Sequence, residues 1–374
     1  MRIYYMHAKV FKEVYYLKNM VWTKPIYNRT KVDNAGHILT NKEVSQEDIE
    51  NALTVLNNWR SSHGYPMNTF QARLRQKAKV IDNTSLVVQR LKRVPSIIKK
   101  LGREQTKTMT LSQMQDIAGC RAVLFDIGKV NQLVDIYRKS RGLKHKRVKK
   151  REKDYIKNPK SDGYRSIHLI YKYKSDKIKT YDGFLIEIQF RSKIQHAWAT
   201  AIEIVDLFTK QAIKSNEGEE EWKNFFRLVS SAFAKIEEQP EVPNTPQDPN
   251  ILYNEIKSKV EKLKIFSKMD SWSKALKVIE PQLKEHHFFL LELDVSEENN
   301  AKLSVRGYPE EAESLATEHY LEAEKLQSGN LNKDVVLVGA RSIEELKKAY
   351  LNYFADSKEF LGYLKNYLEK RGNI

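Results

Sequence analysis

The sequence predicts a mixed α/β fold, in which helices flank a β-sheet, followed by a smaller α+β unit. Two neighbouring stretches, Ser166–Tyr173 and Phe184–Arg191, alternate between apolar and polar residues as half-buried strands do. Helical patterns precede and follow these strands. Four prolines within Glu238–Asn250 separate them from a second group of helices and strands. These three observations give the fold class and the two-part organisation.

The first unit is expected to alternate helices with strands. Ser45 is a candidate N-cap of a helix whose apolar stripe is Ile49, Leu53, Leu56 and Trp59. Residues 1–42 give no clear pattern. The remaining helices are expected at Asn83–Lys100, Met109–Gln115, Val130–Arg138, Lys193–Phe208 and Glu219–Ile236, with a buried strand at Arg121–Phe125. Pro95 marks either a kink in its helix or a fresh helix start.

The proline-rich segment divides the chain into residues 1–237, a solvated linker at 238–250 and a C-terminal unit at 251–374. That unit is expected to hold helices at Ile251–Ile265, Trp272–Ile279 and Pro309–Leu326, and a long helix or helix pair within Ser342–Arg371. Its strands are expected at Phe288–Val295, Ala301–Tyr308 and Val335–Val338, and the apolar stretch Phe288–Leu293 is expected to be exposed.

Composition excludes several classes of protein. The 374 residues are 41% hydrophobic, enough for ordinary globular cores, yet no apolar run approaches the length of a membrane span. Cys120 is the single cysteine, so the chain has no internal disulfide and no cysteine-based zinc site. A cytoplasmic protein without membrane contact is expected.

The formal net charge is +17, and the excess is uneven. Residues 138–160 carry twelve lysines and arginines against two acidic residues, whereas Pro309–Glu324 is acidic. Such a basic run is often a solvated loop, but this one leads into an aromatic loop, which favours contact with a polyanion. The basic first half and the acidic stretch are expected to attract each other.

Polar residues share one face of the expected strand at 184–191. A period of two places Glu187, Gln189 and Arg191 together, opposite the apolar set. The upstream loop combines cations with aromatic rings, in Lys153, Tyr155, Lys157, Lys160, Tyr164 and Arg165. Cations suit phosphates and aromatic rings suit bases, so the pattern indicates nucleotide or nucleic-acid recognition.

Four motifs in order resemble the synthetase domain of the RelA/SpoT alarmone enzymes: Gln89–Lys100, Asp116–Val123, Lys153–His168 and Ile186–Glu203. The resemblance covers roughly residues 51–234. It implies a nucleotidyltransferase-like fold and transfer of pyrophosphate from ATP to a ribose 3′-hydroxyl, with Mg²⁺.

The resemblance also assigns roles to residues. It implies that Asp116 and Glu187 hold Mg²⁺; from spacing alone, Asp116 is as well explained as a helix or turn cap. Glu187 or Gln189 lies near the proton of the attacking hydroxyl, and Glu187 is the better base. The residues implied to bind ATP are Arg90, Lys92, Ser96, Lys100 and Arg121, with the two arginines bracketing adenine. Without the resemblance, an exposed basic helix is the simpler reading of that segment.

On the acceptor side, Tyr164 matches the tyrosine that stacks on the acceptor base, and Lys160 and His168 match residues near it. The expected acceptor set is Lys153, Tyr155, Lys160, Tyr164, Arg165 and His168. His196 departs from the family, which often has asparagine or methionine there, so its role is open.

The acceptor itself has two candidates. No His-Asp dipeptide occurs, so the hydrolase activity of the long alarmone enzymes is not expected. The acceptor is then either GDP or GTP, or the 3′-terminal adenosine of tRNA. The basic run favours the larger polyanion, because a free nucleotide needs few cations. The alternative from another class of function is a non-catalytic module that binds RNA or the ribosome. The presence of both Asp116 and Glu187 argues against this alternative.

The C-terminal unit resembles the antitoxin-like pseudo-zinc-finger domain of fused toxin–antitoxin (CapRel-type) antiphage proteins. Tyr350-Leu351-Asn352-Tyr353 matches the element that occludes the ATP site in that group. By themselves these rings are more typical of an aromatic core, and only the resemblance of the whole unit favours the occluding role. The resemblance implies an autoinhibited enzyme, released by a phage protein, that modifies the tRNA 3′ end and inhibits translation.

Overall fold

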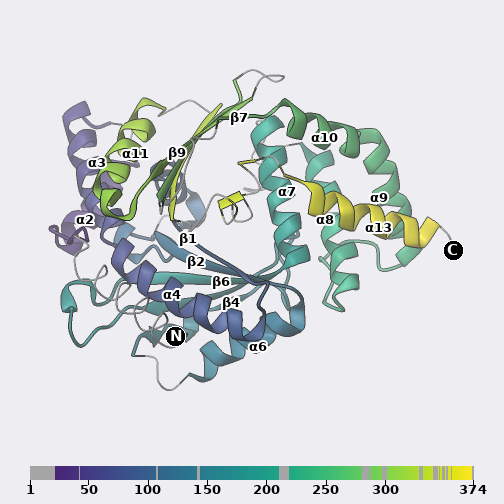
Figure 1. Cartoon of the computed structure of the whole chain (residues 1–374), viewed down its shortest axis with the longest axis horizontal. Helices are drawn as coiled ribbons and strands as arrows, with labels where there is room; N and C mark the ends of the chain where they lie inside the picture. Colours follow the sequence, from purple (N-terminus) through teal and green to yellow (C-terminus); the bar gives the residue numbers. More distant parts are fainter. Residues whose placement is uncertain are drawn as a thin grey trace, which may run out of the picture.

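The computed structural model describes residues 22–372, except for 42, 107, 141–143, 210–218, 280–285, 287, 297–300, 328–331, 340–343, 345, 348–349, 351–352 and 355. Within these residues, two sheets and their helices form the molecule (Figure 1). The predicted mixed α/β fold, a sheet flanked by helices, is confirmed.

The larger sheet has the order β1-β2-β6-β5-β3, with β4 also paired to β5. Its strands are β1 (Leu86–Leu91), β2 (Ala118–Leu124), β3 (Lys146–Arg147), β4 (Lys153–Asp154), β5 (Ile167–Lys172) and β6 (Leu185–Ser192). β2 and β6 run parallel, and the other pairs are antiparallel. The strands predicted at Ser166–Tyr173 and Phe184–Arg191 are confirmed as β5 and β6, which pair with each other.

Helices cover one face of this sheet because the alternation of its strands puts apolar side chains there. α4 (Gly64–Ile81) and α6 (Ile127–Lys139) lie below it in Figure 1. Ile186, Ile188 and Phe190 of β6 are fully buried in the same core as Phe70 of α4. α2 (Arg29–Ile38), α3 (Gln46–Ser61), α5 (Val94–Leu101) and short 3-10 turns complete this side. The polar side chains of β6 lie on the opposite face of the sheet, away from this core.

A second, four-stranded sheet lies in the C-terminal part, in the order β10-β8-β9-β7. Its strands are β7 (Lys277–Ile279), β8 (Phe288–Asp294), β9 (Lys302–Tyr308) and β10 (Lys333–Gly339), and α11 (Glu313–Leu326) packs on it. The expectation that Phe288–Leu293 is exposed is wrong. β8 lies between β10 and β9, and Phe289, Leu291 and Leu293 are buried.

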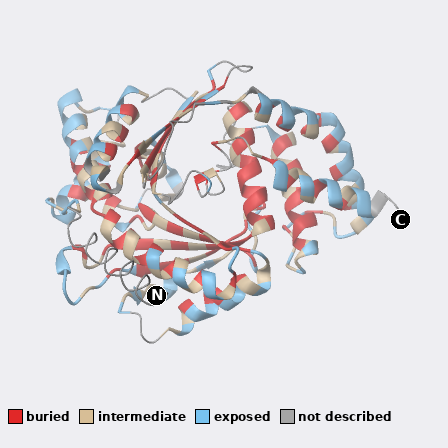
Figure 2. Cartoon of the chain, in the orientation of Figure 1, coloured by how far each residue is buried: buried red, intermediate tan, exposed pale blue. Residues whose placement is uncertain are grey.

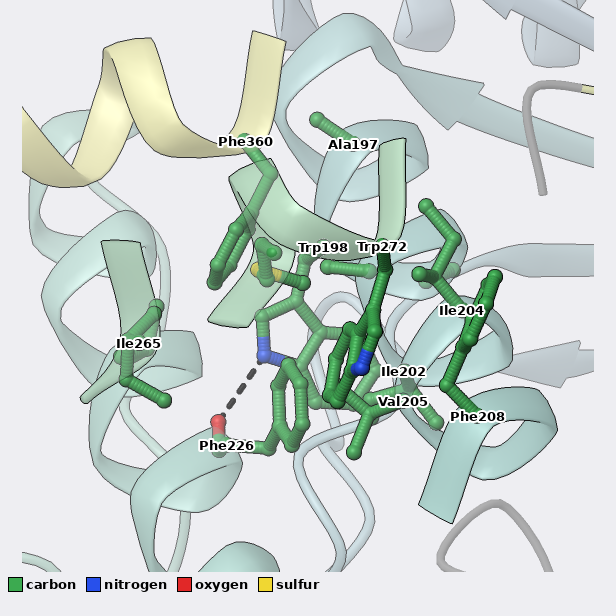
Figure 3. Packing of buried hydrophobic residues seen from close by; sticks show 14 of the residues in the cluster. Ala197, Trp198, Ile202, Ile204, Val205, Phe208, Phe226, Ile265, Trp272 and Phe360 are labelled. Atoms are coloured by element: carbon green, nitrogen blue, oxygen red, sulfur yellow. Dashed lines mark hydrogen bonds between the residues drawn. The ribbon is translucent and has the colours of Figure 1, made fainter. Parts of the chain in front are cut away.

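One apolar core joins both parts of the chain. α7 (Lys193–Thr209) and α8 (Glu220–Ile236) pack with α9 (Pro249–Leu263), α10 (Ile265–Ala275) and α13 (Lys358–Gly372). In Figure 3, Phe360 points from α13 toward the Trp198 and Phe226 side chains, and the ring centres of Phe360 and Phe226 lie 5.9 Å apart. The Trp198 indole donates to the Phe226 carbonyl oxygen at 2.9 Å. Figure 2 shows the facing sides of α7 and α8 buried.

The proline-rich segment is not a solvated linker, because the side chain of Val242 is buried against α8. Val242 is 1% exposed, and its N–H donates to Ser231 Oγ at 2.9 Å. Thr245 also exchanges a hydrogen bond with Ser231, at 2.8 Å. These residues therefore pack against α8, whereas the division of the chain into two domains at 238–250 stays a prediction.

Two expected helices are partly strands. Within Asn83–Lys100, β1 pairs with β2 along its whole length, and α5 then starts next to Pro95, in agreement with a fresh helix start. Within Trp272–Ile279, α10 ends at Ala275 and β7 pairs with β9. Met109–Gln115 holds only a 3-10 turn, at Leu111–Gln113. Of the expected helix within Ser342–Arg371, α13 is described, while residues 342–343 and several others lie outside the described part.

No helix in the described ranges is both long and apolar enough to span a bilayer.

Candidate active site

The polar face of the larger sheet gathers residues from four strands. In the strand register, Gln189 of β6 lies beside Arg121 of β2 and His168 of β5, and Arg121 Nε donates to Gln189 Oε1 at 3.4 Å. Arg90 of β1 and Glu187 of β6 both lie beside Gly119 of β2, a residue without a side chain to stand between them. Sequence positions up to a hundred residues apart thus meet on one surface.

Glu187 is held by two neighbours. His168 Nδ1 lies 2.9 Å from Glu187 Oε1, and Gln189 Nε2 donates to Glu187 Oε2 at 2.6 Å. Burial acts to raise the pKa of Glu187, but His168 outweighs it and leaves that pKa below its usual value, while the charge of Asp116 opposes the lowering. Glu187 is therefore an ionised, oriented carboxylate close enough to Asp116 for their charges to interact.

Asp116 lies between two lysines at the entrance to β2. Lys92 Nζ is 3.1 Å from Asp116 Oδ2, and Lys100 Nζ is 2.8 Å from Asp116 Oδ1. Burial favours the neutral acid, but the two lysines hold the pKa of Asp116 well below its usual range. Asp116 does not cap a helix here; it binds side chains that the sequence assigned to ATP. Ser96 lies in the first turn of α5, the helix that also carries Lys100.

The acceptor loop forms a cluster of rings and cations. Lys160 Nζ lies 4.8 Å from the ring centre of Tyr155 and 5.2 Å from that of Tyr164. The Tyr164 hydroxyl lies 2.8 Å from His168 Nε2. Burial acts to lower the pKa of His168, but the charges of Tyr164 and Glu187 outweigh burial and raise that pKa to about 9. A chain of contacts therefore runs from Lys160 through Tyr164 and His168 to Glu187.

The loop turns at a position that only glycine suits. Gly163 has a φ of +90°, and a Cβ there would lie 2.9 Å from both the Trp198 ring and the Ser230 side chain. Lys153 pairs with His168 where β4 meets β5 and is exposed beside the cluster. Arg165 is placed elsewhere: it is 4% exposed, and its Nε donates to Ser230 Oγ at 3.0 Å. Its contacts are structural rather than directed toward an acceptor.

Arg191 is a site residue that the sequence prediction left out, although the alternation of β6 had placed it on this face. Its Nη2 donates to the Tyr164 hydroxyl at 2.7 Å, and its guanidinium lies 5.0 Å from the ring centre. Burial raises the pKa of Tyr164, but Arg191 and His168 outweigh it and lower that pKa to about 7. His196 is buried nearby, and both its ring nitrogens lack a hydrogen-bond partner within the described residues.

The C-terminal part lies against the same sheet. β10 packs against β1, and the Tyr350 hydroxyl donates to the Gln89 carbonyl oxygen at 2.8 Å. Burial raises the pKa of Tyr350 to about 12, against the opposing charges of Arg90 and Arg121. The Tyr353 hydroxyl donates to Asp334 Oδ2 at 2.8 Å. Leu351 and Asn352, between the two tyrosines, lie outside the described residues.

The donor set suits Mg²⁺, which prefers one or two carboxylates together with substrate phosphates and water. Asp116 and Glu187 supply the carboxylates, and the described part of the chain has no group of three or more His, Cys, Asp or Glu that would bind a metal without such help. The residues thus fit a magnesium ion that arrives with a nucleotide.

Comparison with known proteins agrees with the motifs. Residues 89–206 match the family model described as the region found in RelA/SpoT proteins. This part of the chain is similar to that region. It contains both carboxylates, the predicted ATP residues and the acceptor loop.

Two curated relatives are GTP pyrophosphokinases of Bacillus subtilis (strain 168). YwaC is 32% identical over 114 residues, and YjbM is 34% identical over 117 residues. Each match covers 30% of this chain and 52% of the relative. The chain therefore spans about half the length of either relative.

Solved structures give only a modest overlap with this chain. The small alarmone synthetase 1 of B. subtilis bound to pppGpp is 23% identical and covers 47% of this chain and 89% of its own, with a TM-score of 0.40. A GTP pyrophosphokinase family protein from Streptococcus pneumoniae is 23% identical and covers 60% and 98%, also with a TM-score of 0.40.

Proposed function

We propose that this chain is a pyrophosphokinase that transfers pyrophosphate from ATP to the 3′-hydroxyl of the terminal adenosine of tRNA, and thereby inhibits translation. One observation carries the proposal. The lysine-bound Asp116 and the ionised, histidine-bound Glu187 lie on one sheet face, next to a loop of lysines and tyrosines, inside the stretch that is similar to the RelA/SpoT region.

The side chains divide the reaction between donor and acceptor. Lys92, Lys100 and Ser96 bind the phosphates of ATP, and Arg90 and Arg121 stack on its adenine. Asp116 and Glu187 would hold Mg²⁺, which would supply positive charge to the phosphates of ATP. Fixing the triphosphate in this way would hold its β-phosphorus ready for the acceptor.

On that side, Tyr164 and Tyr155 provide rings for the acceptor base, and Arg191 fixes the orientation of Tyr164. The ribose 3′-oxygen forms a bond to the β-phosphorus while the bond from that phosphorus to the α–β bridging oxygen breaks, and AMP leaves. Glu187 accepts the hydroxyl proton, because it is ionised and positioned by His168 and Gln189.

The positive charge near the acceptor loop favours a large polyanion as the acceptor. Lysines 146, 149, 150, 153, 157 and 160 are exposed on the segment that leads into the acceptor loop. Arg138 and Arg147, by contrast, pair with Glu152 and are not available to a ligand. The exposed lysines are more numerous than one nucleotide needs, which supports tRNA. GDP or GTP is the second candidate acceptor, because both curated relatives are GTP pyrophosphokinases.

We further propose that the C-terminal part inhibits the enzyme and that a phage protein releases it. Tyr350 supports this proposal, because it binds the β1 backbone next to Arg90 and interacts with both arginines assigned to adenine. We expect Tyr350 to compete with adenine for this part of β1, so activity is expected to require the C-terminal part to move.

The test is incubation with γ-labelled ATP and either deacylated tRNA, GDP or GTP, using the full chain and its Tyr350→Ala variant. A truncation after Gln239 is less suitable, because it exposes the apolar faces of α7 and α8 that bind α9, α10 and α13. We expect label in tRNA, stronger for the variant and absent for Glu187→Gln. Label only in the guanosine nucleotide would establish an alarmone synthetase. RNA binding without AMP release would establish a non-catalytic module.

A further inference from the structure

Glu324 joins the acidic C-terminal part to the start of α5. It lies in the last turn of α11, and its Oε1 accepts a hydrogen bond from the Val94 N–H at 3.0 Å. Its Oε2 lies 3.4 Å from Arg60 Nη1, and both side chains are nearly inaccessible, at 9% and 2% exposed. One carboxylate therefore bridges a helix N-terminus and a buried guanidinium, across 230 residues of sequence.

The start of α5 has hydrogen-bond donors that no side chain of its own N-cap residue satisfies. The N-cap residue Arg93 makes no side-chain capping bond, and Pro95 has no N–H, so Val94 and Ser96 carry the donors of the first turn. A helix N-terminus also favours negative charge. Ser96 of this turn is already assigned to ATP phosphates, so an anion bound to Val94 lies in the same turn.

Arg60 adds a charge that the described structure satisfies only in part. It is 1% exposed, its Nη1 also donates to Asn57, and its guanidinium lies 4.8 Å from the ring centre of Tyr320 on α11. Its Nε has no hydrogen-bond partner within the described residues. A buried guanidinium with a vacant donor suits an anion with more oxygens than one carboxylate, such as a phosphate.

The position of Glu324 on its own helix is unfavourable. A carboxylate in the last turn of a helix is repelled by the partial negative charge there. The α5 N-terminus and Arg60 offset that repulsion only while the C-terminal part stays in place. Arg93 and Asp334 form a second ion pair in the same contact region.

We infer that the Val94 N–H and the Arg60 guanidinium form an anion-binding site for a substrate phosphate, which Glu324 fills as an internal substitute. The inference rests on the proposed function for the identity of the substrate, ATP. It differs from the Tyr350 contact, which lies at the adenine side. Glu324 and a phosphate compete for the same two groups, so removing the glutamate charge strengthens phosphate binding.

The test uses the full chain and α,β-methylene-ATP with Mg²⁺, measured by titration calorimetry. Glu324→Gln keeps the shape and the bond to Val94 but loses the charge, and we expect binding about tenfold tighter. Glu322→Gln is the matched control, an exposed glutamate on the same helix, and its affinity should equal that of the unaltered chain. Equal affinity of both variants would overturn the inference.

Two further arms identify the site. Tripolyphosphate should bind the Glu324→Gln variant more tightly than the unaltered chain, and adenosine should not. An equal gain for adenosine would mean that Glu324 only keeps the C-terminal part in place and does not compete with a phosphate. Arg60→Gln, added to Glu324→Gln, should remove most of the gain, and Arg60→Lys should restore part of it. A double variant that is folded by circular dichroism and still binds tightly would exclude Arg60 as a phosphate ligand.

These measurements need no turnover, so they separate the two proposals. Tighter binding without label transfer to any acceptor would refute the proposed function and leave this site standing. Label transfer with unchanged affinity in Glu324→Gln would do the reverse.

Discussion

Replacing Tyr350 with phenylalanine tests the contact between the C-terminal part and β1 with the smallest possible change. The substitution removes one hydroxyl, whose bond to the Gln89 carbonyl oxygen is 2.8 Å long and buried, and leaves the ring in place. A typical hydrogen bond contributes about 1 kcal/mol, and a buried acceptor left without its donor costs about 1–3 kcal/mol. We therefore expect the closed arrangement to lose about 1–2 kcal/mol.

That loss has a measurable consequence. A change of about 1–2 kcal/mol shifts an equilibrium roughly 5- to 30-fold, so α,β-methylene-ATP should bind tighter by up to that factor. Titration calorimetry on the full chain measures it. Tyr363→Phe is the control, since Tyr363 lies on α13 and packs its ring on Phe233, away from β1. Unchanged affinity in Tyr350→Phe, or an equal gain in the control, would refute the role of this hydroxyl.

Three other predictions concern folding and pH. Gly163→Ala should lower the free energy of unfolding by about 2 kcal/mol or more, because its φ is +90° and Trp198 is in the way; a denaturant midpoint equal to that of the unaltered chain would contradict this. Phe360→Ala should lower the free energy of unfolding by about 3–5 kcal/mol, because its ring fills the core shared with α7 and α8, and a loss below about 1 kcal/mol would contradict this. Burial lowers the pKa of His63 to about 3, so stability is full above pH 6.5 and falls as the pH drops toward 3, by about 2 kcal/mol at pH 5. His63→Gln should flatten the pH dependence, and an unchanged slope would contradict it.

The sequence predicted the polar face of β6 well, because the signal for it was local. The alternation of β6 placed Glu187, Gln189 and Arg191 on one face, and the structure has them there. It did not reveal that Arg191 binds Tyr164 while Arg165 turns inward to Ser230, because both are arginines near one loop and only the tertiary packing distinguishes them.

Strand β1 was harder to predict. Its six residues, Leu86–Leu91, fit a short strand as well as the start of a helix, and the pairing with β2 decides between them. The buried position of β8 likewise depends on β9 and β10 on its two sides, which no local pattern reports. The contact of Glu324 with Arg60 and Val94 joins residues far apart in the sequence. The sequence predicted only that the acidic stretch attracts the basic first half of the chain.

The most direct test of the whole account is label transfer by the full chain carrying Tyr350→Phe, compared with the same chain carrying Glu187→Gln in addition. With γ-labelled ATP and deacylated tRNA, the account predicts that the first protein labels tRNA and releases AMP in equal amount. The second protein, folded to the same extent by circular dichroism, should do neither. Equal labelling by both would contradict the role of Glu187, and with it the assignment of this sheet face as the active site.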